Sequence, residues 1–395
     1  MFAEPSWRFG CDNGGRNLLT FAIPFNRPTR TPQDAGNLQA ALAQGKLSGD
    51  GPFTHRCHRM LEQMAGVPKA LLTTSCTHAL EMAALLLDIR AGDEVIVPSF
   101  TFVSSVNAFV LRGAQPVFAD IRPDTLCIDE RHLEGLITDR TRAVIIVHYA
   151  GVACEMDAID GVAKTTGCAI VEDNAHGLFG RYKGRNLGTF GSLTALSFHE
   201  TKNVTCGEGG ALLLNDVSLF ERAEIIREKG TDRSKFFRGE LTKYEWVDLG
   251  SSYLPSELLA ALLAGQLEHA AVIQAQRQNL WHRYQSGLAD WARSREIVLP
   301  TVPPWCDQSF HMFQVLLPSN DCRGRLIAHL KSHGILAVSH YQPLHLSKMG
   351  RAFGGRPGDC PVTERVAERL LRLPFYTNMT VDEQNTVIEA LHAWR

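Results

Sequence analysis

The chain has 395 residues, of which 45% are hydrophobic and 21% charged, and its formal net charge is −2. This length predicts two domains rather than one simple core. The sequence has no run of 18 apolar residues, no basic tract and no apolar N-terminal stretch. We therefore expect no membrane span, no nucleic-acid partner and no secretory signal.

The ten cysteines are scattered along the chain, and none lies within four positions of another. This spacing excludes a CxxC-type zinc or redox motif and argues against a disulfide framework. A reducing compartment fits best, so we expect a cytoplasmic protein.

The predicted elements begin after a glycine-rich stretch at 1–22, which we expect to be a loose N-terminal extension. Beyond it, helical patterns alternate with short strands rich in valine and isoleucine. The helices are expected at 77–89, 103–112 and 155–167, and the strands at 94–98, 116–120, 143–148, 169–173, 194–198 and 210–214. This alternation predicts an α/β fold with a mostly parallel sheet covered on both faces.

A long helical pattern at 257–290 could connect this sheet to a second domain. Strands at 313–317 and 335–340, together with terminal helices, follow it. We therefore expect a large domain at 23–275 and a smaller α/β domain at 276–395. Ligands of parallel sheets bind beyond the carboxyl ends of the strands. The polar residues at those ends are Ser99, Asp120, His148 and Asp173.

The segment SFHETKNVTCGEGG places Lys202 after a strand and before a glycine-rich turn. A lysine that condenses with a carbonyl must be nucleophilic near neutral pH, and partial burial lowers its pKa accordingly. The motif alone fits a surface lysine before a hairpin equally well.

The segment VEDNAHG places Asp173 at the end of a buried strand. A buried carboxylate needs a partner, and a protonated pyridine nitrogen is one. His176 could hydrogen-bond the phenolic oxygen of such a cofactor. The simpler alternatives are a helix cap for Asp173 and a packing role for His176.

Small hydroxyl residues open a helix in TTSCTHAL, where free amides and the helix dipole favour phosphate. Thr77 and the amides of Thr77 and His78 could hold a phosphate group, with Ser197 as a further contact. Capping by Ser75 or Thr77 would explain the same pattern. Phe102 in PSFTFVSS could stack on a pyridine ring or belong to the core.

The order of these motifs resembles the DegT/DnrJ/EryC1/StrS aminotransferases, which are fold-type-I enzymes dependent on pyridoxal 5′-phosphate (PLP). The resemblance runs from about residue 23 to the C-terminus. It is carried by GDEVIVPSFTFVSS, HYAGVACEMD, VEDNAHG, SFHETKN, GEGG and HYQPLH.

The resemblance implies a role for each matching residue. Lys202 matches the Schiff-base lysine, and Asp173 matches the partner of the pyridine nitrogen. His176 falls near the ring, and Phe102 matches the stacking aromatic. The phosphate site is matched by Thr77, His78 and Ser197. Members are homodimers with shared active sites, in which an asparagine of the neighbouring chain reaches the phosphate. Here that segment reads GSSY, with Ser252 in place of the asparagine.

The resemblance also implies glutamate as amino donor and a nucleotide-linked keto-sugar as acceptor. The stretches EIIREKGTDRSKFFRGE and KYEWVDLGSSYLPSE resemble members that convert TDP-4-keto-6-deoxyglucose to TDP-4-amino-4,6-dideoxygalactose. The cations Arg233, Lys235 and Arg238 could meet the substrate diphosphate, or form a solvated loop. His340 of HYQPLH is a further candidate for substrate contact.

Several alternatives stay open. The acceptor could be a 3-keto sugar or carry another nucleotide. Some relatives of this fold are dehydratases with histidine in place of the lysine, which Lys202 opposes. A regulator would need a DNA-binding appendage, for which 1–22 is too short. We expect no metal, although His340 and His345 have a suitable spacing.

Overall fold

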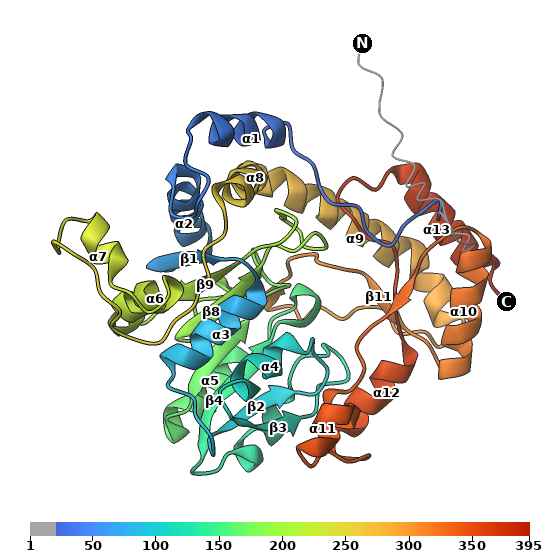
Figure 1. Ribbon diagram of the computed structural model, residues 1–395. Helices are drawn as coiled ribbons and strands as arrows, with labels where there is room; N and C mark the ends of the chain where they lie inside the picture. Colours follow the sequence, from blue (N-terminus) through green and yellow to red (C-terminus); the bar gives the residue numbers. More distant parts are fainter. Residues whose placement is uncertain (1–20) are drawn as a thin grey trace, which may run out of the picture.

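The computed structural model describes residues 21–395, so nearly all of the expected extension at 1–22 lies outside the described residues. Its centre is a seven-stranded sheet with the order β1-β9-β8-β5-β4-β2-β3 (Figure 1). The strands are β1 (Lys69–Thr73), β2 (Glu94–Pro98), β3 (Gln115–Ala119), β4 (Thr141–Val147), β5 (Ala169–Asp173), β8 (Leu193–Ser197) and β9 (Gly210–Leu214). β3, β2, β4, β5 and β8 run parallel, whereas β9 is antiparallel to β8 and β1. The mostly parallel sheet is thus confirmed.

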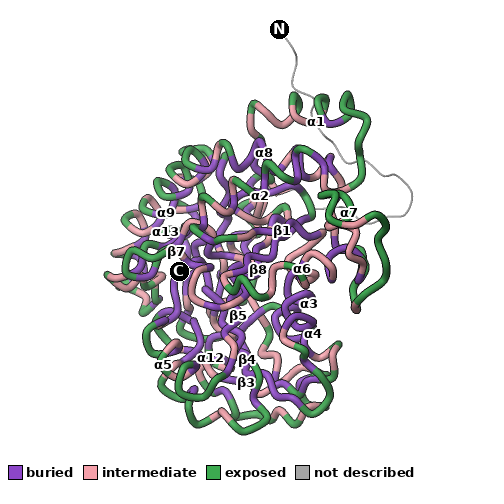
Figure 2. Tube along the Cα trace, turned by 90° about the vertical axis from the view of Figure 1, so that its left-hand side faces the viewer, coloured by how far each residue is buried: buried purple, intermediate pink, exposed green. Residues whose placement is uncertain are grey.

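Helices cover both faces of this sheet. One face packs against α3 (Cys76–Leu86), α4 (Ser104–Val110) and α6 (Phe220–Arg227), and the other against α2 (Pro52–Ala65), α5 (Met156–Thr166) and α8 (Glu257–Glu268). Along β4, Val144 and Ile146 join one core while Ala143 and Ile145 join the other. Because successive side chains alternate between two buried faces, the strands are apolar throughout. Figure 2 shows the strands buried and α1 (Asp34–Ala43) largely exposed.

A second, three-stranded sheet has the order β11-β13-β12 and consists of β11 (Gln314–Leu316), β12 (Val338–Ser339) and β13 (Leu370–Arg372). It shares a core with α9 (Ala270–Arg293), α10 (Asn320–Ser332) and α13 (Val381–Ala393). A further small sheet contains β10 (Cys306–Asp307), β6 (Arg181–Tyr182) and β7 (Arg185–Asn186). The remaining helices are α7 (Arg233–Phe237), α11 (Lys348–Ala352), α12 (Pro361–Arg369) and the short 3-10 turns η1 (Glu130–His132), η2 (Glu134–Leu136), η3 (Tyr149–Gly151), η4 (Val217–Leu219) and η5 (Leu344–Leu346).

The helical pattern expected at 257–290 is confirmed, but it is divided between α8 and α9, which meet at His269 with a bend of 63°. The chain turns where its apolar face changes partner. Ile273 still packs in the core of the large sheet, whereas Leu280 belongs to the core of the small sheet. We accordingly propose a domain boundary near residue 275, within the first turns of α9.

Within residues 21–395 no single helix has the length and apolar character needed to cross a membrane, although α8 and α9 taken together pass that test as a bent pair. The short strands β1 and β13 were not expected from the sequence. The strand expected at 335–340 is reduced to Val338–Ser339.

Candidate active site

The candidate site lies at the edge of the large sheet where the parallel strands end. Asp173 is the last residue of β5, and Ser197 is the last residue of β8. Gly210 at the start of β9 pairs with Ser197 on one side and with Thr73 on the other. The sequence motifs around these residues therefore meet at one edge, as expected for such a sheet.

Three of the four polar residues at strand ends have structural partners instead. These partners are His345 for Ser99, the first amides of α12 for Asp120, and Glu172 for His148. Of the four residues, only Asp173 contributes to the pKa of Lys202, which its negative charge raises. The strand-end rule thus selects the correct edge of the sheet, but not the reactive residue on it.

Lys202 lies on the turn that follows β8. Its amide donates to the carbonyl of His199 at 2.9 Å, and the amide of Glu200 donates to Gly207 across the same loop at 2.9 Å. Burial lowers the pKa of Lys202 to about 8, while Asp173 raises it and Arg372 lowers it further. Because a larger fraction of the amine is then neutral near physiological pH, Lys202 has the nucleophilic character that carbonyl condensation requires.

Asn203 fixes the turn that carries Lys202. Its side-chain amide donates to the carbonyl of Ser309 at 2.7 Å and to Gln274 at 3.1 Å. Its Oδ1 lies 2.9 Å from Nδ1 of His311. The lysine is therefore held between the large sheet and the segment that leads into β11.

Asp173 is buried and keeps its carboxylate ordered. Ser105 Oγ donates to Oδ2 at 2.6 Å, and the amide of Ala175 donates to Oδ1 at 3.2 Å. The Ala175 contact is consistent with the helix-cap alternative, but it uses only one of the available acceptor positions. Asp173 can therefore also accept from a protonated ring nitrogen.

The expected phosphate contacts lie at the start of α3. Ser75 caps this helix by accepting the amide of His78 at 3.1 Å, so capping by Ser75 is confirmed. In this structure the His78 amide donates to Ser75, so the contact between His78 and a phosphate group stays a prediction. Thr77 Oγ1 lies 2.8 Å from Ser104 Oγ, which places two hydroxyl groups beside the helix start.

Gly210 allows the phosphate-binding turn to approach the sheet closely. A Cβ atom at this position would overlap the backbone of Ser75 and Cys76. The glycine of GEGG and the small residues of TTSC thus form one close contact, although they are distant in sequence. This packing brings the start of α3 to the same edge as Lys202.

His176 is buried next to this edge, and its ring stacks on that of His311 with centroids 4.2 Å apart. Burial and the nearby Lys202 hold the pKa of His176 well below its usual value. Its Nδ1 is covered and has no partner within the described residues. The stack corresponds to the packing alternative, while the free Nδ1 leaves a hydrogen bond available to a ligand.

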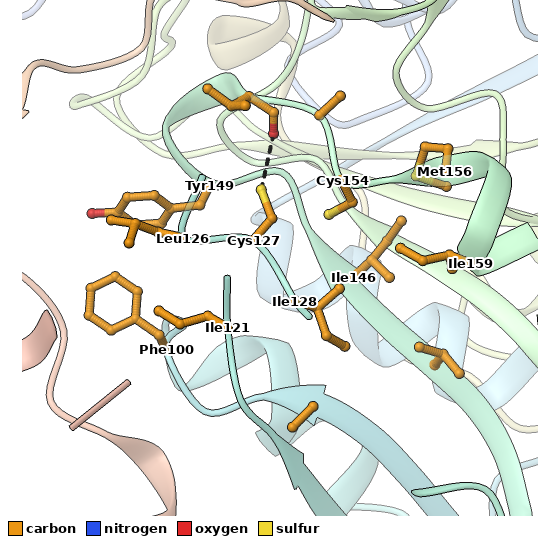
Figure 3. Close-up of a cluster of buried hydrophobic side chains, with 14 of the residues drawn as sticks. Phe100, Ile121, Leu126, Cys127, Ile128, Ile146, Tyr149, Cys154, Met156 and Ile159 are labelled. Atoms are coloured by element: carbon orange, nitrogen blue, oxygen red, sulfur yellow. Dashed lines mark hydrogen bonds between the residues drawn. The ribbon is translucent and has the colours of Figure 1, made fainter. Parts of the chain in front are cut away.

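His340, the residue after β12 of the three-stranded sheet, reaches the same region. Its Nδ1 lies 2.9 Å from the hydroxyl of Tyr149, and its ring stacks on that of Tyr341 with the two centroids 3.5 Å apart. Tyr149 closes one end of an apolar cluster beside Phe100, with its hydroxyl pointing away from that cluster (Figure 3). His345 bonds Ser99 and Glu364 instead, so the two histidines do not converge on a metal.

Phe102 is 56% exposed, and its ring lies 6.4 Å from that of Tyr341. The core alternative for Phe102 is therefore wrong. An exposed aromatic ring next to a strand end is available to stack on a flat ligand.

The remaining predicted contacts lie apart from Lys202. Arg233, Arg238 and Ser252 line a hollow of about 1010 Å³ whose lining does not include Lys202, Asp173 or His176. Each expected cation is ion-paired within the chain, namely Arg233 with Glu228, Lys235 with Glu221, and Arg238 with Glu224 and Glu240. Within one chain, these residues are not part of the lysine site.

The residues around Lys202 fit PLP. A lysine with a lowered pKa, a buried carboxylate, an exposed aromatic ring and a close-packed helix start supply the four kinds of contact that this cofactor requires. The sequence did not indicate Ser105, Asn203, Tyr149, His311 or Arg372. Four residues of this group, Ser105, Asn203, Tyr149 and Tyr341, nevertheless lie inside the motifs PSFTFVSS, SFHETKN, HYAGVACEMD and HYQPLH, whereas His311 and Arg372 lie in none of the quoted motifs.

Comparison with known proteins agrees with this geometry. The model of the DegT/DnrJ/EryC1/StrS aminotransferase family matches residues 28–392. The structure is similar to Spr1654 of Streptococcus pneumoniae in its PLP form, with 28% identity, a TM-score of 0.86 and coverage of 93% of this chain and 97% of that chain. It is also similar to DesV of S. venezuelae, with 32% identity, a TM-score of 0.83 and coverage of 91% and 94%. PseC of Helicobacter pylori, an aminotransferase involved in the biosynthesis of pseudoaminic acid, is 25% identical with a TM-score of 0.84 and coverage of 94% and 98%.

The doubly covered sheet and the lysine at its edge define a PLP-dependent aminotransferase of fold type I. The chain belongs to the DegT/DnrJ/EryC1/StrS aminotransferase family.

Proposed function

We propose that this enzyme transfers the amino group of glutamate to a nucleotide-linked sugar, converting TDP-4-keto-6-deoxyglucose to TDP-4-amino-4,6-dideoxygalactose. The observation that carries the transamination is the position of Lys202, whose pKa is lowered to about 8, beside Asp173 at the strand edge. The sugar acceptor rests on the family membership and on the resemblance of the stretch containing Arg233 and Ser252.

PLP, when bound, supplies an electron sink for negative charge that develops at the reacting carbon. Asp173 would keep the pyridine nitrogen protonated, because a buried carboxylate favours a cationic partner. Lys202 would take a proton from the α-carbon of the donor and later deliver one to the sugar carbon. Phe102 would cover one face of the ring, and Thr77 and Ser197 would hold the phosphate.

The second part of the proposal is a homodimer with shared sites. Ser252, Arg233 and Arg238 line a hollow separate from Lys202, as expected if they serve the site of a neighbouring subunit. Figure 1 shows α7 projecting from the body of the chain. Phe237, Trp246 and Leu249 in this region are 69%, 78% and 50% exposed, which supports a protein partner. We also propose a cytoplasmic location, consistent with the free state of all nine cysteines in the described residues.

The test is to incubate the holoenzyme with glutamate and each of several nucleotide keto-sugars, with the keto group at C3 or C4 and with TDP or UDP. We expect 2-oxoglutarate and a 4-amino TDP-sugar with galacto configuration in equal amounts, identified by NMR. Amination at C3, preference for UDP, or a gluco product would contradict the acceptor. Loss of water from the sugar without amine transfer would contradict the transaminase assignment.

A further inference from the structure

Arg277 is a buried arginine in the second turn of α9, close to the lysine site. Its Nε donates to the carbonyl of Phe310 at 2.9 Å, and its Nη2 donates to the carbonyl of His311. Its Nη1 donates to Thr377 Oγ1 at 3.3 Å, and its guanidinium carbon lies 4.7 Å from the centroid of the Phe375 ring. Among residues 21–395 no carboxylate acts on its pKa, so backbone carbonyls take the place of an acidic partner.

The carbonyls that Arg277 holds belong to a turn with an unusual backbone. Phe310 has a left-handed conformation, with a φ of 52°. Such a conformation is costly for a residue with a bulky side chain, so contacts around it must hold it in place. In this conformation two consecutive carbonyls, those of Phe310 and His311, accept from one guanidinium. Arg277 therefore stabilises the conformation of segment 309–311.

Segment 309–311 in turn holds Asn203 at both ends of its side-chain amide. The carbonyl of Ser309 accepts from Asn203 Nδ2 at 2.7 Å, and Nδ1 of His311 lies 2.9 Å from Asn203 Oδ1. Asn203 directly follows Lys202 in the chain. These contacts therefore fix the backbone at the reactive residue.

The first turns of α9 provide a second contact to the same amide. Gln274 Oε1 accepts from Asn203 Nδ2 at 3.1 Å. Gln274 and Arg277 are three positions apart, so they lie on the same face of the helix. This face reaches Asn203 directly through Gln274 and indirectly through the segment that Arg277 holds. The start of α9 is thus connected to the turn that carries Lys202.

Arg283, six positions later in α9, provides a contrast. Its guanidinium donates to Gln384 at 3.0 Å and to Asn385 at 2.8 Å. Both acceptors are side chains of α13, which packs in the core of the small sheet. Arg283 thus connects two helices, whereas Arg277 holds backbone that contacts the residue after the lysine.

We propose that Arg277 is a positioning residue for Lys202. It holds segment 309–311, and this segment fixes, through Asn203, the turn that carries Lys202. The inference rests on the proposed role of Lys202 and not on the proposed sugar. The step that it serves is the condensation of the Lys202 amine with the PLP aldehyde, in which a carbon–nitrogen double bond forms and the aldehyde oxygen leaves as water with the two amine hydrogens. Position matters here, because a displacement of about 1 Å can slow such a step about 100-fold.

The first measurement separates the position of Lys202 from the shape of the cofactor site. The cofactor-free protein is mixed with PLP, and condensation is followed by absorbance. The same protein is titrated with pyridoxamine phosphate, which has no aldehyde for the lysine to attack. We expect Arg277→Met to slow condensation about 10- to 100-fold and to leave the dissociation constant of pyridoxamine phosphate unchanged.

Arg277→Lys keeps the charge but replaces the planar fork by a single ammonium group, so it cannot serve both carbonyls equally well. Its rate of condensation should lie between those of Arg277→Met and the wild type. If Arg277→Met does not fold, Arg277→Lys carries the same comparison. Equal losses in condensation and in pyridoxamine phosphate binding would show that Arg277 only maintains the shape of the site, and would overturn the proposal.

The second measurement tests whether the effect passes through Asn203. Asn203→Ala removes the side chain that segment 309–311 holds. Because Arg277 acts through that side chain, the double variant should condense with PLP no more slowly than Asn203→Ala alone. If the losses of the two single variants multiply instead, as they do for independent sites, the proposal is wrong.

The matched control is Arg283→Met, which removes an arginine from the same helix and should condense with PLP as the wild type does. Urea unfolding gives the folded fraction of each variant, and rates are compared per folded protein. Equal slowing in Arg277→Met and Arg283→Met would overturn the proposal. Borohydride reduction and mass spectrometry locate the adduct. An adduct on another lysine in the wild type would remove the proposed role of Lys202 and this inference with it, whereas an adduct on Lys202 with an unchanged rate in Arg277→Met would overturn only the role of Arg277.

Discussion

The imidazole rings of His176 and His311 stack with their centroids 4.2 Å apart and their planes 15° from parallel. His176 follows β5 of the large sheet, and His311 precedes β11 of the small sheet. His311 also lies 2.9 Å from Oδ1 of Asn203, the residue after Lys202. The stack therefore connects the two sheets through the turn that carries the reactive lysine.

This stack predicts a loss of stability in acid. Burial holds the pKa values of His176 and His311 well below their usual range in the folded protein. The unfolded chain, with histidine pKa values of about 6.5, therefore binds more protons as the pH falls. Each residue contributes stability that is present above about pH 6.5 and is lost below it, by up to about 1.4 kcal/mol per pH unit.

His311→Gln should accordingly reduce the slope of the free energy of unfolding against pH by up to about 1.4 kcal/mol per pH unit below about pH 6.5. The measurement is the free energy of urea unfolding at a series of pH values between about 5 and 7. His282→Gln, at an exposed position of α9, is the control and should keep the wild-type slope. An identical slope in the two variants would show that His311 binds protons equally in the folded and the unfolded protein, so that folding does not lower its pKa.

The lowered pKa of Lys202 predicts how fast the cofactor-free protein captures PLP. The neutral amine is the nucleophile, so the rate should rise with pH and level off above a pKa of about 8. Nα-acetyl-lysine is the reference, and its rate should continue to rise toward its ordinary pKa of about 10.4. Borohydride reduction followed by mass spectrometry should place the adduct on Lys202, and an adduct on another lysine would refute the assignment.

The sheet was predictable because its strands carry local signals. β2, β4 and β5 are short apolar runs between turns, and both of their faces are buried. The same signals placed Asp173 at the end of one predicted strand and Lys202 after the next, whereas the lysine motif alone fitted a surface lysine equally well. The break at His269 was not predictable, because the helical pattern continues through it and only the change of packing partner causes the bend.

The other half of the site could not be read from the sequence. His311 and Arg372 follow the lysine motif by more than a hundred residues, and neither lies in a recognisable pattern. Their proximity to Lys202 depends on how the small sheet packs against the large one. Arg372 stands out only because its covered Nε has no hydrogen-bond partner among the described residues, which is a property of the folded chain.

Asp173→Asn should retain PLP but lose turnover by about 100-fold or more, the scale for removing one group that stabilises developing charge. The carboxylate matters most when negative charge develops at the reacting carbon, and less for binding. Turnover and the PLP dissociation constant are measured on the same preparation. Ser105→Ala, which removes the 2.6 Å bond to Asp173 and the 2.8 Å bond with Thr101 Oγ1 but keeps the carboxylate, should change turnover by about tenfold or less. Near-normal turnover in Asp173→Asn would reduce this residue to a helix cap.

Gly210→Ala should affect both stability and cofactor binding. The added Cβ would overlap the backbone of Ser75 and Cys76, and β9 cannot shift easily because it pairs with β1 and β8. We expect a loss of about 1–3 kcal/mol in the free energy of unfolding, as for an overpacked core position. Ser75 and Cys76 form the start of α3, so a shift of their backbone would move the proposed phosphate contacts. The PLP dissociation constant should therefore rise at least about tenfold, the effect of losing one charge-assisted contact.

Gly161→Ala on α5 is the matched control, because nothing lies within 4 Å of its added Cβ. It should stabilise the protein by up to about 1 kcal/mol through helix propensity and leave PLP binding unchanged. Urea unfolding and a fluorescence titration with PLP measure the two effects separately. If Gly210→Ala loses stability but binds PLP as tightly as wild type, the close contact between GEGG and TTSC serves packing alone, and the start of α3 does not hold the phosphate.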